Sequence, residues 1–527
     1  MSNEFLDSLE NLDALNVSDF IKFSQRGIEK ENLRSSNCSI SLKAHPKAYG
    51  SSLTNSRITT DFSEALIELV TDPNKDLNNC LKELEDIVYF CLKNTDDDFW
   101  PASIPMSIKD EAKIPIADYG DTNSGKLKKL YRVGLSHRYG SMMQTVSGIH
   151  YNFSFDDQLF ENWAKKEGET LREFKDKKYL SLVRNFRRNA WLITYLFGCS
   201  PIVPKAFAKG REHSLKELNP TDLYLENATC LRMGELGYIS KSQDNLNIAY
   251  NNLEEYLGDL KKALTTDHPR YKTLGTKVND EYIQLNTAII QIENEYYSSI
   301  RPKRLVGSGE RPINALRDKG IEYVEIRALD NNIYDPFGIS DETAIFLESF
   351  LFYCLLSKDQ PCEKNEIRKI QSNWSNVVLY GRDEDLKLDF KDGSFFLRDK
   401  AAEIIDEMAN LGARIGNLEY KAIFKKSLET QQNKISDSDK TPSGRLLKEI
   451  ISSDATWDKY ADDIAKSHKE EILKLNREVH YLEKQASESL KEFARKEDEE
   501  EKDFDSFLAE YPVSYTHLRA HETSLHL

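Results

Sequence analysis

The chain has 527 residues, of which 39% are hydrophobic and 10% aromatic. This composition excludes a charge-rich disordered chain, and the length allows a large buried core. The formal net charge is −16, so the overall field repels nucleic acid and anionic membrane, and we expect neither as a partner. A nucleotide phosphate would therefore need local cations or a metal ion.

The N-terminal stretch, the apolar stretches and the cysteines all favour a cytoplasmic protein. Met1–Leu15 is acidic and lacks the basic start and apolar core of a signal peptide. The longest apolar stretch, Ala344–Leu356, is too short for a bilayer, which needs roughly 20 apolar residues, and it predicts a buried helix. The seven cysteines contain no C-x-x-C pair, so neither a disulfide framework nor a thiolate zinc site is indicated.

Residue spacing predicts two helices and two strands before residue 330. Apolar residues recur three or four apart over Leu77–Leu92 and Leu246–Leu264, which is typical of helices with one buried face. Polar and apolar residues alternate over Ser147–Phe155 and over Gly320–Arg327, which is typical of strands. No repeat or long linker divides the chain, so residues 1–512 are expected to form one large domain.

A helical region is expected from about residue 440 onward. Apolar residues from Ile472 to Phe493 follow a near-heptad spacing and predict one long amphipathic helix. Because fewer than four heptads are present, we favour docking on the same chain over a dimerising coiled coil, and we expect a monomer. The acidic run Glu497–Asp505 is interpreted as a solvated end, and Val513–Leu527, which breaks the pattern, as a non-native tail.

Carboxylates near the N-terminus are the first candidate metal ligands. Glu29 and Glu31 are two residues apart and share a face if the segment is extended, so they can hold Mg²⁺, which prefers oxygen ligands. Asp61 and Glu68 lie in an otherwise apolar run, where a buried carboxylate needs a partner. The alternatives are a solvated charged strand for the first pair and an ordinary buried salt bridge for Glu68.

A histidine and an asparagine share a face of the first predicted strand. His150 beside Asn152 can ligate a metal or hydrogen-bond a substrate, although a lone histidine is more often a structural group.

Basic residues form the third kind of candidate. Arg301, Lys303 and Arg304 surround a proline and can clamp a phosphate, although such a cluster is also typical of a surface loop. Glu325 and Arg327 share a face of the second predicted strand, where a metal ligand beside an oxyanion ligand would suit phosphoryl transfer. The chain has no P-loop, Rossmann, H-E-x-x-H or G-x-S-x-G motif, which disfavours those enzyme classes.

Taken in order, several motifs resemble those of the glutamate–cysteine ligase family of enteric and related bacteria. They are QRGIEKENLR, ITTDFSEALIEL, YGSMMQTVSGIHYNFS, LGYISKSQ, IENEYYSSIRPKR and GIEYVEIRALD. The resemblance runs from about Phe23 to Gly338, is looser from Ile339 to about Phe507, and is absent from 513–527. It implies an α+β fold with an antiparallel sheet rolled into a funnel, helices packed outside, and a relation to glutamine synthetase and the guanidino kinases.

The same resemblance implies roles for individual residues. Two or three Mg²⁺ ions, or Mn²⁺ in their place, would be held by Glu29, Glu31, Asp61, Glu68, His150 and Glu325. Arg327 matches the arginine beside the transferred phosphoryl group. The positions that line the substrate pocket are matched by Phe62, Tyr131, Arg132, Leu135, Gln144, Asn152, Arg232, Tyr238 and Tyr297.

The resemblance also implies an activity. ATP would phosphorylate the γ-carboxylate of L-glutamate, and the amine of L-cysteine would attack the acyl phosphate, the first step of glutathione biosynthesis. Glutathione is then expected as a feedback inhibitor, because it fits the same γ-glutamyl pocket. Two other hypotheses stay open: a ligase that joins glutamate to another amine, and a non-catalytic scaffold of the same fold.

Overall fold

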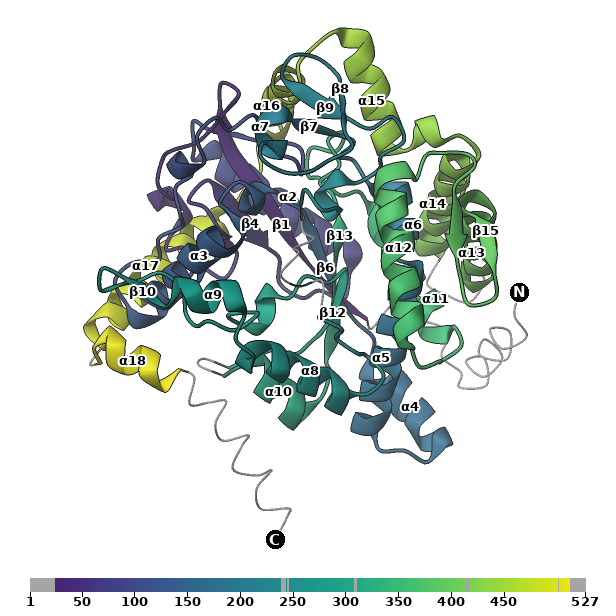
Figure 1. Cartoon of the computed structure of the whole chain (residues 1–527), viewed down its shortest axis with the longest axis horizontal. Coiled ribbons are helices and arrows are strands. Elements are labelled where there is room, and N and C mark those ends of the chain that lie inside the picture. The colour runs from purple at the N-terminus through teal and green to yellow at the C-terminus, as the bar shows by residue number, and fades with distance from the viewer. Residues whose placement is uncertain are drawn as a thin grey trace.

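A curved antiparallel sheet occupies the centre of the computed structural model, which describes residues 24–237, 243, 246–307, 310–412, 418–500 and 502–511 (Figure 1). Its strands lie in the order β12-β13-β6-β1-β4-β3, and each neighbouring pair is antiparallel. The strands are β1 Gln25–Ser36, β3 Ile58–Thr60, β4 Leu66–Val70, β6 Ile149–Ser154, β12 Ile300–Lys303 and β13 Tyr323–Leu329. The two predicted strands are thereby confirmed as β6 and β13.

Alternation along these strands separates a core face from a polar face. On β1, Ile28 is fully buried, whereas Glu29 and Glu31 on either side of Lys30 point to the opposite face. Tyr151 of β6 and Val324 of β13 pack on the same core face as Ile28. The core face therefore fixes the direction of every polar side chain opposite it, because a register slip of one residue would turn the charges into the apolar core.

Helices α2 Leu77–Lys93, α5 Leu171–Asn189 and α11 Asp341–Leu356 cover the core face. Helix α11 confirms the buried helix that was expected over Ala344–Leu356. Its one buried acid, Glu348, is paired with Arg26 of β1 at 2.7 Å and accepts a hydrogen bond from Tyr151 at 2.7 Å. This network joins α11 to the two central strands, which is why a charge is tolerated inside an apolar helix.

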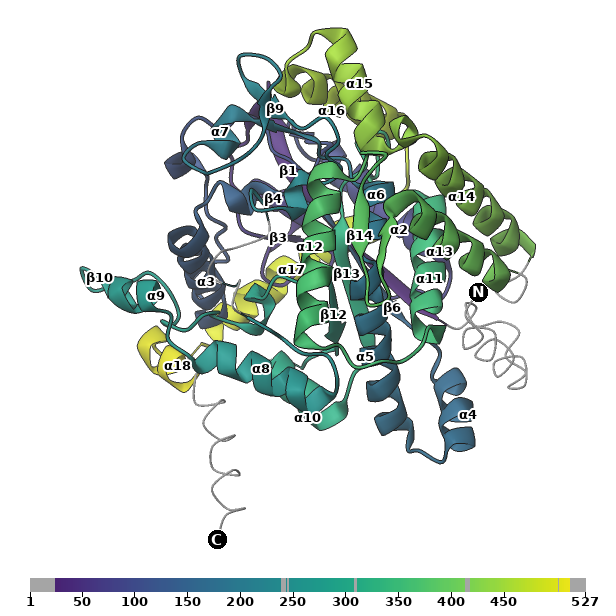
Figure 2. The same cartoon turned by 45° about the vertical axis from the view of Figure 1, so that its right-hand side comes forward.

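An outer layer of helices packs on α5, α6 and α11 (Figure 2). It contains α12 Lys364–Tyr380, α13 Leu397–Gly412 and α14 Leu418–Ser436. The other helices are α3 Asn123–Tyr139, α4 Asp157–Glu167, α6 Trp191–Phe197, α7 Lys205–Ala208, α8 Leu253–Thr265, α9 Pro269–Leu274, α10 Pro312–Lys319 and α15 Pro442–Ser453. Helix α8 begins at Leu253, later than expected, because Asn252 caps it by accepting from the Glu255 amide.

Short strands complete the description. β2 Ser39–Ile40 and β5 Asp98–Phe99 pair with the far end of β1. Small separate sheets are formed by β7 Ile202–Pro204, β8 Lys216–Glu217 and β9 Asp222–Tyr224, by β10 Lys277–Val278 and β11 Glu281–Tyr282, and by β14 Lys387–Asp389 and β15 Ser394–Phe396. Among the described residues, no helix is long and apolar enough to cross a membrane. The mixed helix and antiparallel-sheet fold is confirmed, while the funnel form stays a prediction.

The prediction of one continuous helix from Ile472 to Phe493 is wrong. Helix α16, Trp457–Lys474, ends near the start of this range, and helix α17, His480–Asp498, begins after a turn. Asn476 in this turn has a φ of 46°, a left-handed conformation that asparagine tolerates and a helix does not continue through. The heptad-like spacing therefore comes from two helices, each with its own buried face.

Helix α17 docks on the same chain, as expected. The Ser489 hydroxyl accepts from the Ser51 amide at 3.0 Å, and a Cβ at Gly50 would lie 2.2 Å from that hydroxyl. The described charged residues of the acidic run are exposed, as expected for a solvated segment, and Glu500 also accepts from the Asn123 amide and side chain at the start of α3. Helix α18, Phe504–Glu510, then begins inside the same run. Residues 1–23, Tyr238 and the predicted tail 513–527 lie outside the described residues.

Candidate active site

The polar face of the sheet gathers charged side chains from five strands. The register places Glu29 directly opposite His150, Glu31 opposite Glu68, and Glu325 opposite both Asn152 and Arg301. Residues that are directly opposite in an antiparallel pair share a face and lie about 4.5–5.5 Å apart at Cβ. Segments up to 300 residues apart in sequence thereby form one cluster.

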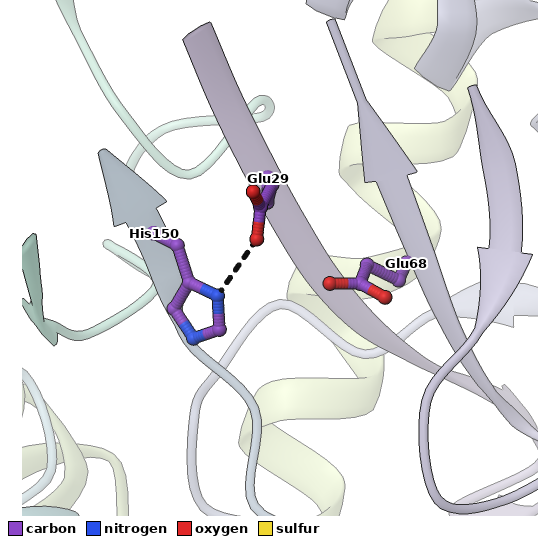
Figure 3. Close-up of side chains that lie close together, drawn as sticks. All are labelled: Glu29, Glu68 and His150. Carbon is purple, nitrogen blue, oxygen red and sulfur yellow. Dashed lines mark hydrogen bonds and ion pairs between the residues drawn. The ribbon is translucent and has the colours of Figure 1, made fainter. Parts of the chain in front are cut away.

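The centre of this face is a group of two carboxylates and one imidazole. Figure 3 shows Glu29, Glu68 and His150 projecting from β1, β4 and β6 toward one another. One potential ligand atom from each lies within 4.8 Å of the others. Glu29 Oε2 is 3.1 Å from His150 Nδ1, and Asn152 donates to Glu29 Oε1 at 2.8 Å.

The other expected metal ligands surround this centre. Glu31 Oε1 lies 3.5 Å from His150 Nε2, and its second oxygen accepts from the Gly148 amide at 2.8 Å. Glu325 Oε1 lies 4.0 Å from His150 Nδ1. Asp61 is more exposed than the others and lies 3.7 Å from Arg132.

Burial and mutual repulsion disfavour the negative charges of the clustered carboxylates. Desolvation, followed by repulsion from Glu29 and Asp61, raises the pKa of Glu68 well above its usual range, and burial also raises the pKa of Glu31. Burial alone would raise the pKa of Glu29 as well, but the hydrogen bond with His150 holds it below its usual value. His150 Nε2 has no hydrogen-bond partner among the described residues. Clustered oxygen donors and an imidazole nitrogen without a hydrogen bond suit a divalent cation such as Mg²⁺ or Mn²⁺.

Cations border the group of Glu29, Glu68 and His150, called here the metal-type cluster, on the side of β12. Glu325 lies 3.3 Å from Arg327, 3.6 Å from Lys303 and 3.8 Å from Arg301. Although Glu325 is buried, these three cations hold its pKa well below its usual range. Glu325 therefore joins the acidic half of the face to a basic half that can bind phosphate oxygens.

Arg327 sits at an irregularity in β13. Ile326 pairs with Tyr151 and Leu329 with Ile149, so that Arg327 and Ala328 both stand opposite His150. Such a bulge bends a strand locally and redirects a side chain. Here it brings Arg327 Nη1 to 3.3 Å from His150 Nδ1, at the boundary between the two halves.

The structure does not bring Arg304 to this face. Its guanidinium donates to the carbonyls of Lys319 at 2.6 Å and Gly320 at 3.0 Å, at the C-terminal end of α10. Cations are favourable at that end of a helix. The expected three-residue cluster is thus reduced to Arg301 and Lys303 on the polar face.

The residues expected in the substrate pocket fall into two groups. Gln144 donates to the Tyr297 hydroxyl at 3.3 Å, and Arg132 donates to the carbonyl of Asp61, so these polar groups border the face. Phe62 and Leu135 belong instead to a buried apolar cluster on which the partly buried Tyr131 packs.

Arg232 is also fully buried. It pairs with Asp330 at 2.6 Å and donates to the Leu329 carbonyl at 2.6 Å.

A cavity of about 400 Å³ opens beside Arg327 and Tyr297. Its walls include Gln243, the last residue of the motif LGYISKSQ, and also Arg187 and Trp374, which the sequence motifs do not contain. Trp374 lies on α12, far along the chain, and carries no motif, so only the packing of α12 near the end of β13 reveals it. The sole sequence signal was its helical spacing, which indicates burial and not a site.

Comparison with known proteins places the chain in a family. The family model described as glutamate-cysteine ligase matches residues 9–377. Glutamate–cysteine ligase of Alcanivorax borkumensis is 40% identical over 92% of this chain and 95% of its own length. The Pseudomonas entomophila enzyme is 41% identical over 94% and 95%, respectively.

Solved structures agree with the sequence matches. The crystal structure of glutamate–cysteine ligase from Francisella tularensis in complex with AMP superimposes with a TM-score of 0.88 and 36% identity, over 95% of this chain and 99% of that one. A bifunctional glutathione synthetase from Pasteurella multocida shares the fold, with a TM-score of 0.67 and 21% identity, over 89% of this chain and 55% of that one. By sequence and by structure, the chain belongs to the glutamate–cysteine ligase family.

Proposed function

We propose that this enzyme joins the γ-carboxylate of L-glutamate to the amine of L-cysteine, with ATP as co-substrate. The observation that carries the proposal is the single sheet face on which Glu29, Glu68 and His150 lie beside the cations around Glu325. A carboxylate–amine ligase needs both, because its reaction transfers a phosphoryl group to a carboxylate and then displaces phosphate. Family membership supports the same activity, as the first step of glutathione biosynthesis.

The metal ligands proposed are Glu29, Glu31, Asp61, Glu68, His150 and Glu325. The raised pKa values of Glu31 and Glu68, and a His150 Nε2 without a hydrogen-bond partner among the described residues, fit two or three Mg²⁺ ions. Bound Mg²⁺ would neutralise charge on the phosphoryl oxygens.

The basic half of the face then has two tasks. A γ-carboxylate oxygen of glutamate attacks the terminal phosphorus of ATP, the bond to the bridging oxygen breaks, and ADP leaves. Arg327 and Lys303 are positioned to donate to the phosphoryl oxygens during this transfer. When the cysteine amine attacks the acyl phosphate, the same donors stabilise the tetrahedral oxyanion and the departing phosphate, and the amine loses a proton.

Two substrate regions flank this centre. We assign the amino-acid pocket to Tyr131, Arg132, Gln144, Asn152, Arg232, Tyr238 and Tyr297, with Phe62 and Leu135 behind them. The cavity beside Arg327 is assigned to the nucleoside of ATP, since it offers the Trp374 ring and polar Gln243 next to the phosphate-binding cations. The AMP complex of the Francisella tularensis enzyme supports a nucleotide site in this fold.

Several finer points remain part of the proposal. These are inhibition by glutathione, a monomeric state, a cytoplasmic location, a single domain over residues 1–512, and the relation to glutamine synthetase and the guanidino kinases. No separate observation favours the scaffold hypothesis or another amine acceptor.

A single assay tests the proposal. Purified protein with Mg²⁺, ATP and glutamate should release ADP at a high rate only when cysteine is added, and the product should have the mass of γ-glutamylcysteine. A panel of other amines provides the control. If another amine gave faster turnover than cysteine, that amine would be the acceptor in place of cysteine. If ADP release did not depend on any amine, the ligase activity would be contradicted.

A further inference from the structure

A buried ion pair lies directly behind the bulge that presents Arg327. Arg232, in the short turn Leu231–Met233, is fully buried, and its Nε lies 2.6 Å from Asp330 Oδ1. One of its terminal nitrogens donates to the Leu329 carbonyl at 2.6 Å and to the Arg327 carbonyl at 3.4 Å. The guanidinium therefore bridges the two backbone carbonyls that flank Ala328 in the bulge.

The second half of the pair, Asp330, is held from the other side. Its Oδ2 accepts from the Cys199 amide at 2.8 Å and from the Ser200 hydroxyl at 2.7 Å. Three donors thus fix a buried carboxylate that follows β13 directly. A buried carboxylate with this many hydrogen bonds holds its partner in a single orientation.

The same guanidinium reaches the metal-type cluster through Gly148. A Cβ at Gly148 would lie 2.8 Å from a nitrogen of Arg232 and 2.9 Å from the Leu329 carbonyl oxygen. The Gly148 amide donates to Glu31 at 2.8 Å. Arg232 consequently packs against the backbone that orients one expected metal ligand, while it hydrogen-bonds the backbone that carries the expected catalytic arginine.

We propose that Asp330 is a positioning residue: through Arg232 it holds the β13 bulge so that Arg327 faces the phosphoryl group. The inference rests on the proposed ligase activity and adds to it a residue that touches neither substrate nor metal. It also gives Arg232 a task beyond the amino-acid pocket. Since outer partners of this kind typically cost about 10–100-fold when removed, the effect should be large enough to measure.

The test compares Asp330→Asn with Asp97→Asn. Asp97 is a matched control, because it is also buried, pairs with an arginine (Arg34, 2.7 Å) and accepts from a serine hydroxyl (Ser41, 2.7 Å), but it lies at the far end of β1. We expect Asp330→Asn to lower kcat about tenfold or more, with a smaller change in KM for ATP. Asp97→Asn should lower the melting temperature and leave kcat near the wild-type value.

Hydrogen–deuterium exchange supplies a readout that does not depend on activity. The Arg327 amide donates to the Ser299 carbonyl at 2.9 Å, so loss of the bulge support should speed exchange of the 323–330 peptide in Asp330→Asn and not in Asp97→Asn. If Asp330→Asn fails to fold, Ser200→Ala removes one donor to Asp330 and should give the same changes to a smaller extent.

Three results would overturn the inference. These are unchanged kcat and exchange in a folded Asp330→Asn variant, equal kcat losses in both aspartate variants, or a rise in KM for glutamate alone. Failure of the proposed activity would be recognised separately, because the wild-type protein would then release no ADP while the exchange comparison would still decide whether Asp330 holds the bulge.

Discussion

Glu31 on β1 lies directly opposite Glu68 on β4 in the register of the sheet, on the face that also carries His150. Like charges directly opposite each other destabilise a sheet, and burial increases the cost. The two carboxylates are thus kept together at the expense of stability, which is the arrangement expected where a cation binds.

Mg²⁺ should therefore stabilise the folded protein. At a Mg²⁺ concentration of 100 times Kd, the free energy of unfolding should rise by about 2.7 kcal/mol for each ion bound, and chelation with EDTA should reverse the rise in melting temperature. Glu68→Gln should abolish ligation and most of this Mg²⁺ effect without lowering the melting temperature of the metal-free protein.

The exposed Glu488, which is 3.7 Å from Lys484 on α17, provides the control: Glu488→Gln should keep both the activity and the Mg²⁺ response. A Glu68→Gln variant with near-normal turnover at saturating Mg²⁺ would remove Glu68 from the set of metal ligands.

Arg327→Ala should lower kcat much more than it raises KM for ATP or glutamate. The positive charge is needed most where phosphoryl oxygens carry developing charge, and loss of one preorganised donor costs about 10²–10³-fold. Arg327→Lys should recover little, since an ammonium cannot reproduce the planar two-pronged contact with phosphate. Steady-state kinetics of ADP release measures each effect.

Arg304→Ala is the matched control, because Arg304 directly follows β12, the strand paired with β13, but donates to the carbonyls at the end of α10. It should retain a near-normal kcat. If Arg327→Ala kept kcat and only weakened glutamate binding, Arg327 would be a carboxylate anchor, and the phosphate role would pass to Arg301 and Lys303.

The sequence was most informative where a short period governs the structure. A period of two residues is enough to place Glu29 with Glu31 and Glu325 with Arg327 on one face, and the family resemblance supplied which positions match metal ligands. The basic cluster was predicted from clustered charge and not from alternation, and here the structure differs: Arg304 follows Lys303 but donates to a carbonyl at the end of α10.

Long-range packing was not predictable from the sequence alone. The turn at Asn476 has no glycine or proline to mark it, so α16 and α17 were interpreted as one helix. Asp330 and Trp374 hydrogen-bond to partners that are 98 and 141 residues away in sequence, and no local spacing encodes such contacts.

Truncation after Pro512 should leave activity and melting temperature unchanged, whereas truncation after Val479 should destabilise the protein. The second cut removes α17, whose Leu482 and Ala486 are buried against the rest of the chain. Burial of one leucine side chain is worth about 1.5–3 kcal/mol. Thermal unfolding of both truncated chains measures the difference. A large loss of stability after the first cut would show that residues beyond 512 are native and docked.

Trp374→Ala should raise KM for ATP more than it lowers kcat. The indole lines the cavity beside Arg327, and its Nε1 donates to the Met233 carbonyl at 3.1 Å, which fixes the ring in the wall. A nucleobase that stacks on this ring would lose contact area in both the ground state and the transition state. Because binding is weakened equally in the two states, the loss appears in KM.

Trp374→Phe is the matched control. It keeps an aromatic face but loses the hydrogen bond, and its KM for ATP should lie between the values of the wild type and the alanine variant. If KM for cysteine or glutamate rose and KM for ATP did not, the cavity would belong to an amino-acid substrate, and the nucleoside would have to bind elsewhere on the polar face.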